Sequence, residues 1–381
     1  MGTTIDPFYV MEVVAAAEAK EQTGAAVFHL EVGQPSTGAP AGAVAAAHRA
    51  IDDHVLGYTT SRGIPELAPA IARHVGRRYE LELASERIAI TPGASGGFVL
   101  ALLAAFEPGA RVGVPMPGYP CYRNMLTALH MEPIPIRVAA ENRFQPTPAD
   151  LEAAAPLDGI IVASPSNPTG TVLDPVELAA LVGWCDAHDV RFVSDEIYHG
   201  ITFGDRDPLT AAALSDRAIV VNSFSKYFSM TGWRLGWLVL PDELITPVDR
   251  LAQNLVICPP TISQHVALAA IDCTDELDGH VARYRVNRDI LLEGLPRAGL
   301  TDIAPGDGAF YLWVRTDHLA ADSQALAAEW LRELGVAATP GIDFDPVEGH
   351  RYVRFSYCGD EATMRGAVDA LATWRLRQLA H

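Results

Sequence analysis

Residues 218–240 read AIVVNSFSKYFSMTGWRLGWLVL, two apolar runs that flank a polar segment containing Lys226 and Arg234. Both runs, Ala218–Asn222 and Leu235–Leu240, have the length and the apolar content of buried strands. Four runs of the same kind come earlier in the chain, at Arg87–Thr91, Arg111–Pro115, Gly159–Ser164 and Val190–Ser194.

Helical patterns lie between these runs, for example at Gly96–Phe106, Pro175–His188 and Pro260–Asp272. Near-continuous apolar strands separated by helices predict an α/β fold, with a mostly parallel sheet that helices cover on both faces. Ligands of such sheets bind beyond the carboxyl ends of the strands. We therefore look for chemistry in the residues that follow each strand.

The C-terminal part shows a second pattern, which predicts a smaller α/β domain. We expect residues 44–274 to form the large domain, and residues 1–43 and 275–381 to form the small one. The elements expected in the small domain are helices near Val10–Thr23, Asp278–Leu295 and Ser323–Leu334, strands at Phe310–Arg315 and Tyr352–Tyr357, and a final helix.

The composition limits the partners and the compartment. Twenty-eight basic and 47 acidic residues give a formal net charge of −19, which argues against nucleic acid or an anionic membrane as the main partner. The five cysteines are scattered and form no CxxC pair, so we expect reduced thiols in a cytoplasmic protein and no metal site. The start, MGTTIDPFYV, lacks the features of a signal peptide, and the longest apolar run is too short to span a bilayer.

Lys226 lies in Ser223-Phe-Ser225-Lys226, at the end of the predicted strand Ala218–Asn222. Burial and cationic neighbours lower the pKa of an amine and make it nucleophilic. With Arg234 eight residues further on, two hydroxyls, an ammonium and a guanidinium would suit a phosphorylated aldehyde. Taken alone, such a lysine is more often a solvated surface group, so its assignment depends on the other motifs.

Asp195 and Tyr198 occur in Ser194-Asp-Glu-Ile-Tyr198, where the predicted strand Val190–Ser194 ends. A carboxylate at this edge can pair with a protonated pyridine nitrogen and strengthen the ring as an electron sink. Tyr198 could reach the same ring from one side. The structural alternative is a helix N-cap aspartate beside a core tyrosine.

A glycine-rich turn, Thr91-Pro-Gly-Ala94-Ser95-Gly-Gly97, leads into a helical pattern. Backbone N–H groups at such a helix start favour a phosphate. The same letters spell G-x-S-x-G, which a serine hydrolase would use with Ser95 as nucleophile, Asp195 and a histidine. That alternative leaves Lys226, Arg234 and Asn167 without roles, and no histidine stands out as the base.

Two further side chains are suited to hold a small polar ligand. Asn167 lies in Ser164-Pro-Ser-Asn-Pro-Thr-Gly170, a rigid turn that fixes the direction of its amide. Arg354 lies in the strand-like run Tyr352–Tyr357, and a planar guanidinium binds a carboxylate through two parallel hydrogen bonds. Alone, both signals are weak, because Asn–Pro turns are common and strand arginines usually face solvent.

Together, SNPTG (166–170), SDEIY (194–198), SFSK with MTGWRLGW (223–237) and VRFSY (353–357) resemble the class I/II aminotransferases of pyridoxal 5'-phosphate (PLP) fold type I, the aspartate aminotransferase-like family. The stretches occur in the family's order, and the resemblance extends over nearly the whole chain. It implies a seven-stranded, mostly parallel sheet, PLP as cofactor, and transfer of an amino group between an L-amino acid and a 2-oxo acid. A role in amino acid metabolism, in a biosynthetic process, would follow.

The resemblance also assigns roles to single residues. Lys226 would hold PLP as a Schiff base, the internal aldimine, and later move the proton. Asp195 would pair with the pyridine nitrogen, while Tyr198 and Asn167 would hydrogen-bond the phenolic oxygen. Arg354 would bind the α-carboxylate of the substrate.

The remaining assignments complete the cofactor site. Tyr119 would stack on the ring face, although a core aromatic would look the same. Gly33 would belong to the loop that closes over substrate, although a simple turn would look the same. Tyr58 would reach the phosphate of the neighbouring subunit, so the active site would need a homodimer. The residues assigned to the phosphate are Ala94, Ser95, Ser223, Ser225 and Arg234.

Two other PLP-based alternatives remain beside the serine hydrolase: another reaction on the same fold, such as that of a carbon–sulfur lyase, and a PLP-sensing regulator. The acidic charge, and the lack of room for a DNA-binding domain ahead of the motifs, disfavour the regulator. Some aspartate-using relatives carry a lysine where this chain has Ser95, which weakens an aspartate assignment. Tyr119, Phe224 and Trp233 would favour an apolar or aromatic substrate side chain.

Overall fold

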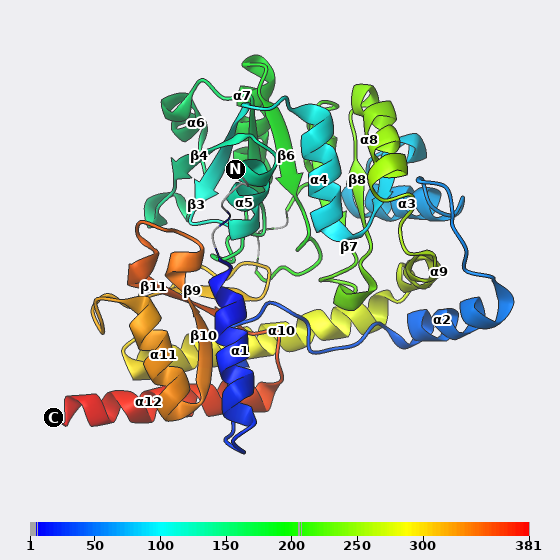
Figure 1. Ribbon diagram of the computed structural model, residues 1–381. Coiled ribbons are helices and arrows are strands. Elements are labelled where there is room, and N and C mark those ends of the chain that lie inside the picture. The colour runs from blue at the N-terminus through cyan, green and yellow to red at the C-terminus, as the bar shows by residue number, and fades with distance from the viewer. Residues whose placement is uncertain (1–4, 6, 205, 207, 381) are drawn as a thin grey trace.

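The computed structural model describes residues 5, 7–204, 206 and 208–380, and the described chain forms two β-sheets in different parts of the molecule (Figure 1). The chain contributes β1 (Phe28–Leu30) to the smaller sheet, builds the larger one, and returns along the 21-residue helix α10 (Thr274–Gly294). Segments from both ends of the chain therefore lie together.

The larger sheet has seven strands in the order β2-β8-β7-β6-β5-β3-β4. Neighbouring strands are parallel except where β8 pairs with β7 and β2. The prediction of a mostly parallel seven-stranded sheet is thus confirmed, as are the six predicted strands. The strands are β2 (Ile88–Thr91), β3 (Arg111–Met116), β4 (Glu132–Arg137), β5 (Gly159–Ala163), β6 (Arg191–Asp195), β7 (Ile219–Ser223) and β8 (Gly236–Val239).

β4 is a strand that the sequence pattern did not indicate. It reads EPIPIR. A central strand forms hydrogen bonds with a neighbour on each side, and proline has no backbone N–H to donate to them. β4 pairs only with β3, at the edge of the sheet. Pro133 and Pro135 are two residues apart, so their backbone nitrogens point to the same side, and an edge strand has one side free.

Helices cover both faces of the large sheet, because alternate strand residues point into two separate cores. In β5, Ile160 and Val162 pack on the side of α3, α6 and α7, whereas Ile161 packs on the side of α4, α5 and α8. The helices are α3 (Leu67–Tyr79), α4 (Gly93–Ala105), α5 (Pro120–Ala128), α6 (Pro148–Ala154), α7 (Pro175–Ala187) and α8 (Asp242–Leu255).

Helix α4 begins three residues before the predicted start at Gly96. The glycines that suggested a longer turn serve close packing instead. A Cβ at Gly96 would lie 2.5 Å from the Pro92 ring, and one at Gly97 would lie 3.2 Å from Leu238 of β8. The missing side chains let the first turn of α4 lie directly on the sheet.

The smaller sheet has the order β1-β10-β11-β9, with β1 parallel to β10 and the other pairs antiparallel. The strand-like runs predicted near residues 310 and 352 are β9 and β11, whereas β1 and β10 were not predicted. The elements are α1 (Tyr9–Glu21), β1 (Phe28–Leu30), β9 (Tyr311–Arg315), α11 (Ser323–Leu334), β10 (Val336–Pro340), β11 (Tyr352–Ser356) and α12 (Glu361–Leu379).

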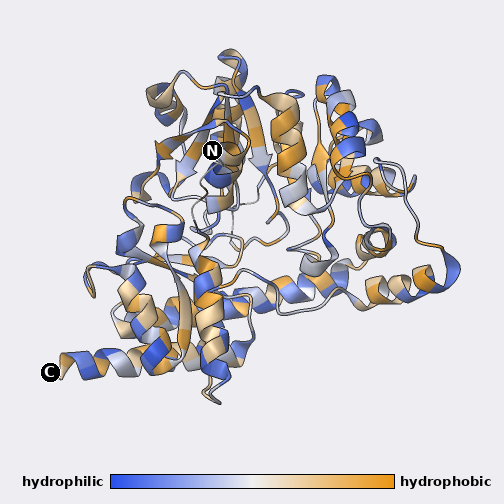
Figure 2. Cartoon of the chain, in the orientation of Figure 1, coloured by the Kyte–Doolittle hydropathy of each residue, from blue (hydrophilic) through white to orange (hydrophobic). Residues whose placement is uncertain are grey.

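The two remaining helices, α2 (Ala41–Asp53) and α9 (Thr261–Ala270), pack together at one end of the molecule (Figure 1). In Figure 2, the orange that marks hydrophobic residues predominates on the large-sheet strands and on α4, while the outer helices alternate between orange and blue. Of the helices in the described ranges, none is both long and apolar enough to cross a bilayer.

Candidate active site

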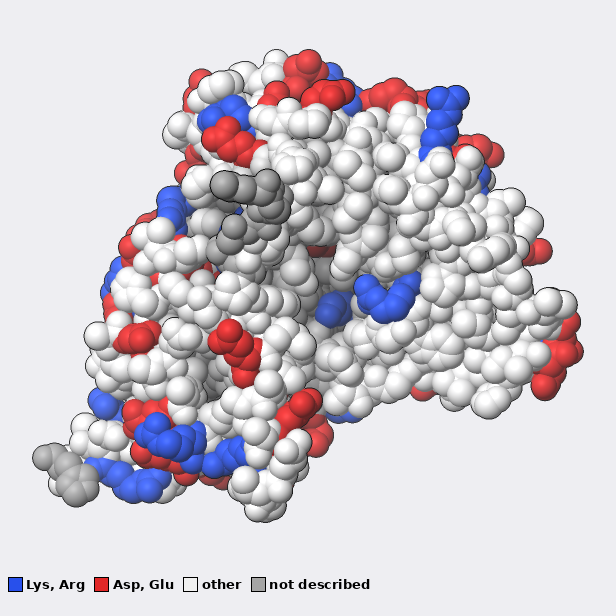
Figure 3. All heavy atoms as spheres, in the orientation of Figure 1, with Lys and Arg blue, Asp and Glu red and all other residues white. Residues whose placement is uncertain are grey.

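A cavity of about 780 Å³ lies where the ends of β6 and β7 face β9 and β11 of the smaller sheet. Figure 3 shows this face hollowed between the two parts of the molecule, with Lys or Arg side chains in and beside the hollow. All but two of the predicted site residues line the cavity: Gly33, Ala94, Ser95, Tyr119, Asn167, Asp195, Tyr198, Ser225, Lys226, Arg234 and Arg354.

Lys226 points into the cavity from the turn that follows β7. Its ammonium nitrogen donates to the carbonyl oxygen of Gly33 at 2.6 Å, and it lies 5.9 Å from the centre of the Tyr198 ring. Burial lowers the pKa of this amine to about 8, and the nearby guanidinium groups of Arg354 and Arg234 act in the same direction. The neutral, nucleophilic form of the amine is therefore reached at a lower pH than in a solvated lysine.

Asp195, the last residue of β6, is buried at the opposite wall. Its Oδ1 accepts from the backbone N–H of Ile197 at 3.1 Å, and its Oδ2 accepts from the hydroxyl of Tyr122. Burial raises the pKa of Asp195 to about 6. Tyr122 was not predicted as a site residue. Its only sequence signal was its place in Pro117-Gly-Tyr-Pro-Cys-Tyr122, beside Tyr119.

A third group of side chains surrounds the start of α4. Gly93 has φ +74°, and a Cβ there would lie 2.6 Å from Nη2 of Arg234. The guanidinium of Arg234 therefore lies against the first turn of α4, whose free N–H groups and dipole favour an anion. Ser225 and Ser95 also line the cavity.

Arg354 enters the cavity from β11. Its Nη1 donates to Oδ1 of Asn167 at 2.9 Å, and its Nη2 donates to the carbonyl oxygen of Glu31. The guanidinium carbon lies 4.4 Å from the centre of the Tyr311 ring and 4.6 Å from that of Phe344. The buried Nε has no hydrogen-bond partner among the described residues. Arg354 is thus held between two rings with a donor left for a ligand.

Tyr311 is a second lining residue that the sequence analysis missed. Its hydroxyl is 2.8 Å from that of Tyr198, and burial raises the pKa of both phenols. The signal in the sequence was weak, because Tyr311 lies among the apolar residues of a predicted strand. The contact also fixes the position of Tyr198 beside Lys226.

Two predicted site residues lie outside the cavity lining. Ser223 is buried behind Ser225, donating to its hydroxyl oxygen at 2.8 Å, so it supports Ser225 rather than facing the cavity. Tyr58 is 84% exposed and away from the cavity.

Phe224 does not face the cavity, contrary to its expected part in substrate choice. It is fully buried, with its ring centre 4.7 Å from that of Phe228 and 5.0 Å from that of Trp237. Trp233 likewise lies outside the lining. In this tight turn the residue before Ser225 points into the core, and a sequence pattern does not reveal that direction.

The cavity also lacks the parts of a hydrolase triad. Its described lining contains Ser95 and Asp195 but no histidine. The histidine nearest in sequence to Asp195 is His199, which is buried and bonded to the carbonyl oxygen of Ser164 at 2.9 Å, and burial lowers its pKa to about 3. The serine hydrolase alternative is therefore not favoured.

Residues 25–371 match the family model described as aminotransferase class I and II. The chain therefore belongs to the class I and II aminotransferases. Members of this family use PLP, and the chain is accordingly an enzyme that transfers an amino group between an amino acid and a 2-oxo acid.

Curated relatives and solved structures agree with this membership. The valine–pyruvate aminotransferase of Mycobacterium tuberculosis is 47% identical over 97% of this chain and 96% of its own length. An aspartate/prephenate aminotransferase of Thermus thermophilus is 32% identical over 96% of this chain and 95% of its own. The crystal structure of an aminotransferase from M. tuberculosis has a TM-score of 0.96 at 47% identity, with 98% of each chain covered. For the T. thermophilus aspartate aminotransferase with maleate, the TM-score is 0.91 at 31% identity, with 97% of each chain covered.

The side chains of the cavity fit PLP. An amine with a lowered pKa, a buried carboxyl and an anion-binding helix start surround one space of suitable size. An aldehyde, a pyridine nitrogen and a phosphate are the groups that these three features bind. The Arg354 guanidinium, whose Nε lacks a partner among the described residues, is chemically suited to a carboxylate outside the cofactor.

Proposed function

We propose that this aminotransferase acts on L-amino acids whose side chains are uncharged and apolar. The observation that carries the proposal is the number of basic side chains that line the cavity. Its described lining has three basic side chains, Lys226, Arg234 and Arg354. The aldehyde, the phosphate and the substrate α-carboxylate account for one each. None of them is left for a carboxylate on the substrate side chain.

The apolar part of the lining supports the same substrate class. The side of the cavity formed by α1, the loop after β1 and α5 presents Phe8, Val10, Met11, Val32 and Met125. Contact with such groups favours an aliphatic side chain by roughly 25 cal/mol for each Å² of apolar surface buried. The 47% identical relative is named for valine and pyruvate, which agrees with an aliphatic donor and a small oxo-acid acceptor.

Bound PLP supplies an aldehyde and an electron-accepting ring. Lys226 is proposed to bond the aldehyde and, once the substrate amine has displaced it, to take the proton from the substrate Cα and return it one step later. General-base work of this kind contributes roughly 10²–10⁴-fold in rate. The lowered pKa of Lys226 suits this role, because a neutral amine is needed to accept the proton.

Asp195 is proposed to set the charge of the ring. Burial raises its pKa to about 6, although the Tyr122 hydroxyl and the Lys226 ammonium both favour the charged carboxylate. A protonated ring nitrogen at this position would restore the charge of the carboxylate, and the Tyr122 hydroxyl holds it in place. Asn167 and Tyr198 would donate to the phenolic oxygen. The first turn of α4, Ser225 and Arg234 would bind the phosphate.

We also propose that the enzyme is a cytoplasmic homodimer that serves amino acid biosynthesis. Exposed apolar side chains gather around α2 and the end of α8, including Val55 (99% exposed), Tyr58 and Ile257. Hydrogen bonding of Thr261 to the Gly57 carbonyl holds this region on α9. An apolar surface of this kind favours binding of a second copy of the chain. Tyr58 would then reach the phosphate of the PLP bound by that second subunit.

A division into domains at residues 43/44 and 274/275 is proposed as well. All seven strands of the large sheet lie within 44–274, and all four strands of the small sheet lie outside it. α10, which begins at Thr274, marks the second boundary. α2 crosses the first boundary, because it begins at Ala41 and packs on α9.

The proposed reaction is tested by half-reactions of the PLP-loaded enzyme with a panel of amino acids. Valine, leucine and alanine should release their matching oxo acids and convert the cofactor to its pyridoxamine form, and aspartate should react far more slowly. Lys226→Ala should abolish the visible absorbance of the covalently held cofactor and the turnover. Pyruvate and ammonia without conversion of the cofactor would instead show a lyase, and preference for aspartate would overturn the assigned substrate class.

A further inference from the structure

Helix α1 begins without a capping side chain of its own. Its N-cap residue is Phe8, which makes no side-chain cap bond. The backbone N–H groups of Tyr9 and Val10 donate instead to Oδ1 and Oδ2 of Asp343, at 3.3 and 3.1 Å. The first N–H groups of a helix require acceptors, and a carboxylate also complements the helix dipole. A residue more than 330 positions away thus caps the helix.

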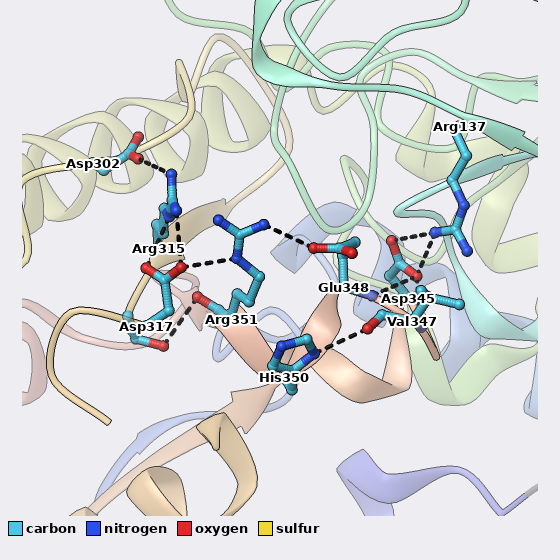
Figure 4. Close-up of polar contacts among 10 residues, drawn as sticks. Arg137, Asp302, Arg315, Asp317, Asp345, Val347, Glu348, His350 and Arg351 are labelled. Carbon is cyan, nitrogen blue, oxygen red and sulfur yellow. Dashed lines mark hydrogen bonds and ion pairs between the residues drawn. The ribbon is translucent and has the colours of Figure 1, made fainter. Parts of the chain in front are cut away.

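Asp343 is itself held by the large part of the molecule. It ends η6 (Gly341–Asp343), its side chain is fully buried, and its carbonyl oxygen accepts from Nη2 of Arg123 in α5 at 2.8 Å. Two residues on, both carboxylate oxygens of Asp345 accept from Arg137 of β4, at 2.7 and 2.8 Å (Figure 4). The segment that caps α1 is therefore fixed to two elements of the large sheet layer.

The helix start that Asp343 holds forms part of the cavity wall. Phe8, Val10 and Met11 all line the cavity, and the rings of Phe8 and Tyr119 pack edge to face with their centres 6.2 Å apart. On the other side of Asp343, the Phe344 ring lies against the Arg354 guanidinium. One short segment thus contacts both the expected carboxylate clamp and the apolar wall beside it.

We infer that Asp343 is a positioning residue for substrate choice: by capping α1 it holds the wall that contacts the substrate side chain. The inference rests on the proposed function, since it assigns that wall to the apolar substrate class. Arg354 would fix the α-carboxylate, so the distance from Arg354 to the wall decides which side chains make contact. A long or branched side chain would reach Phe8 and Met11, whereas the methyl group of alanine would not.

Replacement of Asp343 tests the inference through the ratio of two substrates. Asp343→Ala should lower kcat/KM for leucine or valine by about tenfold, the size expected for loss of a helix cap, and leave that for alanine within about twofold. Asp343→Asn, which keeps one acceptor oxygen, should retain most of the selectivity. Glu12→Gln is the matched control, because Glu12 lies in the first turn of α1 but does not line this cavity.

The absorbance of bound PLP and the thermal midpoint are read for every variant. If leucine and alanine lose activity equally, or if cofactor binding falls with them, Asp343 is merely structural and the inference is wrong, although the proposed function stands. If the wild-type enzyme shows no transamination of any amino acid in the panel, the proposed function itself fails.

A second variant keeps the test independent of folding. Met11 is 56% exposed at the rim of the cavity, so a lysine there places a cation on the proposed wall without burying it. Met11→Lys should raise kcat/KM for aspartate or glutamate by about tenfold and lower that for leucine. No change in either value would show that α1 does not contact the substrate side chain.

Discussion

Lys226 is buried, yet within the described part of the chain its ammonium group donates to one acceptor, the carbonyl oxygen of Gly33. The nearest acid in the cavity, Asp195, favours the charged form, but burial and two guanidinium groups outweigh it, and the pKa falls to about 8. The sign follows from desolvation: burial penalises the ammonium, so the neutral amine forms at a lower pH than in an ordinary lysine.

The lowered pKa predicts how fast the protein freed of cofactor takes up PLP. Because only the neutral amine attacks an aldehyde, the rate of covalent attachment should rise about tenfold per pH unit below pH 8 and level off above it. Stopped-flow absorbance between pH 6 and pH 10 measures this rate, with butylamine and PLP as the reference reaction. A rate that still climbs steeply at pH 10 would show that Lys226 titrates as a solvated lysine.

At the start of α4, the lack of a Cβ at Gly93 lets the Arg234 guanidinium lie against the helix. Gly93 takes a left-handed conformation that costs other residues roughly 1–2 kcal/mol. The same position is where Arg234 lies against the helix. Gly109, in the loop after α4, has a similar φ of +88° but open space around it.

Gly93→Ala and Gly109→Ala therefore form a matched pair. Both should lower the thermal midpoint through backbone strain, whereas only Gly93→Ala displaces Arg234. We expect Gly93→Ala to weaken PLP binding about tenfold to 100-fold, the value of a charge-assisted hydrogen bond, and Gly109→Ala to leave it unchanged. Absorbance titration with PLP gives the dissociation constants of the two variants. Equal values would show that Arg234 does not bind the PLP phosphate.

Elements with local signals were predictable from the sequence, and contacts between distant elements were not. The strands of residues 218–240 follow from their own apolar runs, and Lys226, Asp195 and Arg354 follow from motifs that surround them. By contrast, nothing near Asp343 indicates that it caps a helix at the other end of the chain. Tyr122 and Tyr311 were missed for the same reason, since only the fold brings them to Asp195 and Tyr198.

At the scale of the whole molecule, the exposed apolar surface around α2 bears on assembly. Val55 and Tyr58 lie in the segment between α2 and α3, which stays close to α9 through the stacked rings of His54 and His265, 4.5 Å apart. Burial against a second copy, as proposed above, would remove the exposed Val55 side chain from water. A symmetric dimer would bury the same surface of both copies.

Val55→Lys should accordingly weaken the dimer, detected by sedimentation velocity as a larger monomer fraction at micromolar concentration. Val176→Lys is the control, because Val176 is also exposed, at 79%, but lies at the start of α7. Tyr58→Phe should leave assembly intact and weaken PLP binding severalfold, about the loss of one hydrogen bond. A wild-type monomer with full activity would rule out a shared site.

The capping of α1 by Asp343 also bears on how the reaction and the choice of substrate are divided along the chain. The family match starts at residue 25, after α1 has ended at Glu21, yet it contains Lys226, Asp195 and Arg354. The residues proposed to carry the reaction thus lie in the matched portion, whereas we propose that α1, held by two hydrogen bonds, supplies part of the wall that contacts the substrate side chain. Exchanging that helix together with its fastening residue offers a route to new donor preferences that leaves the chemistry untouched.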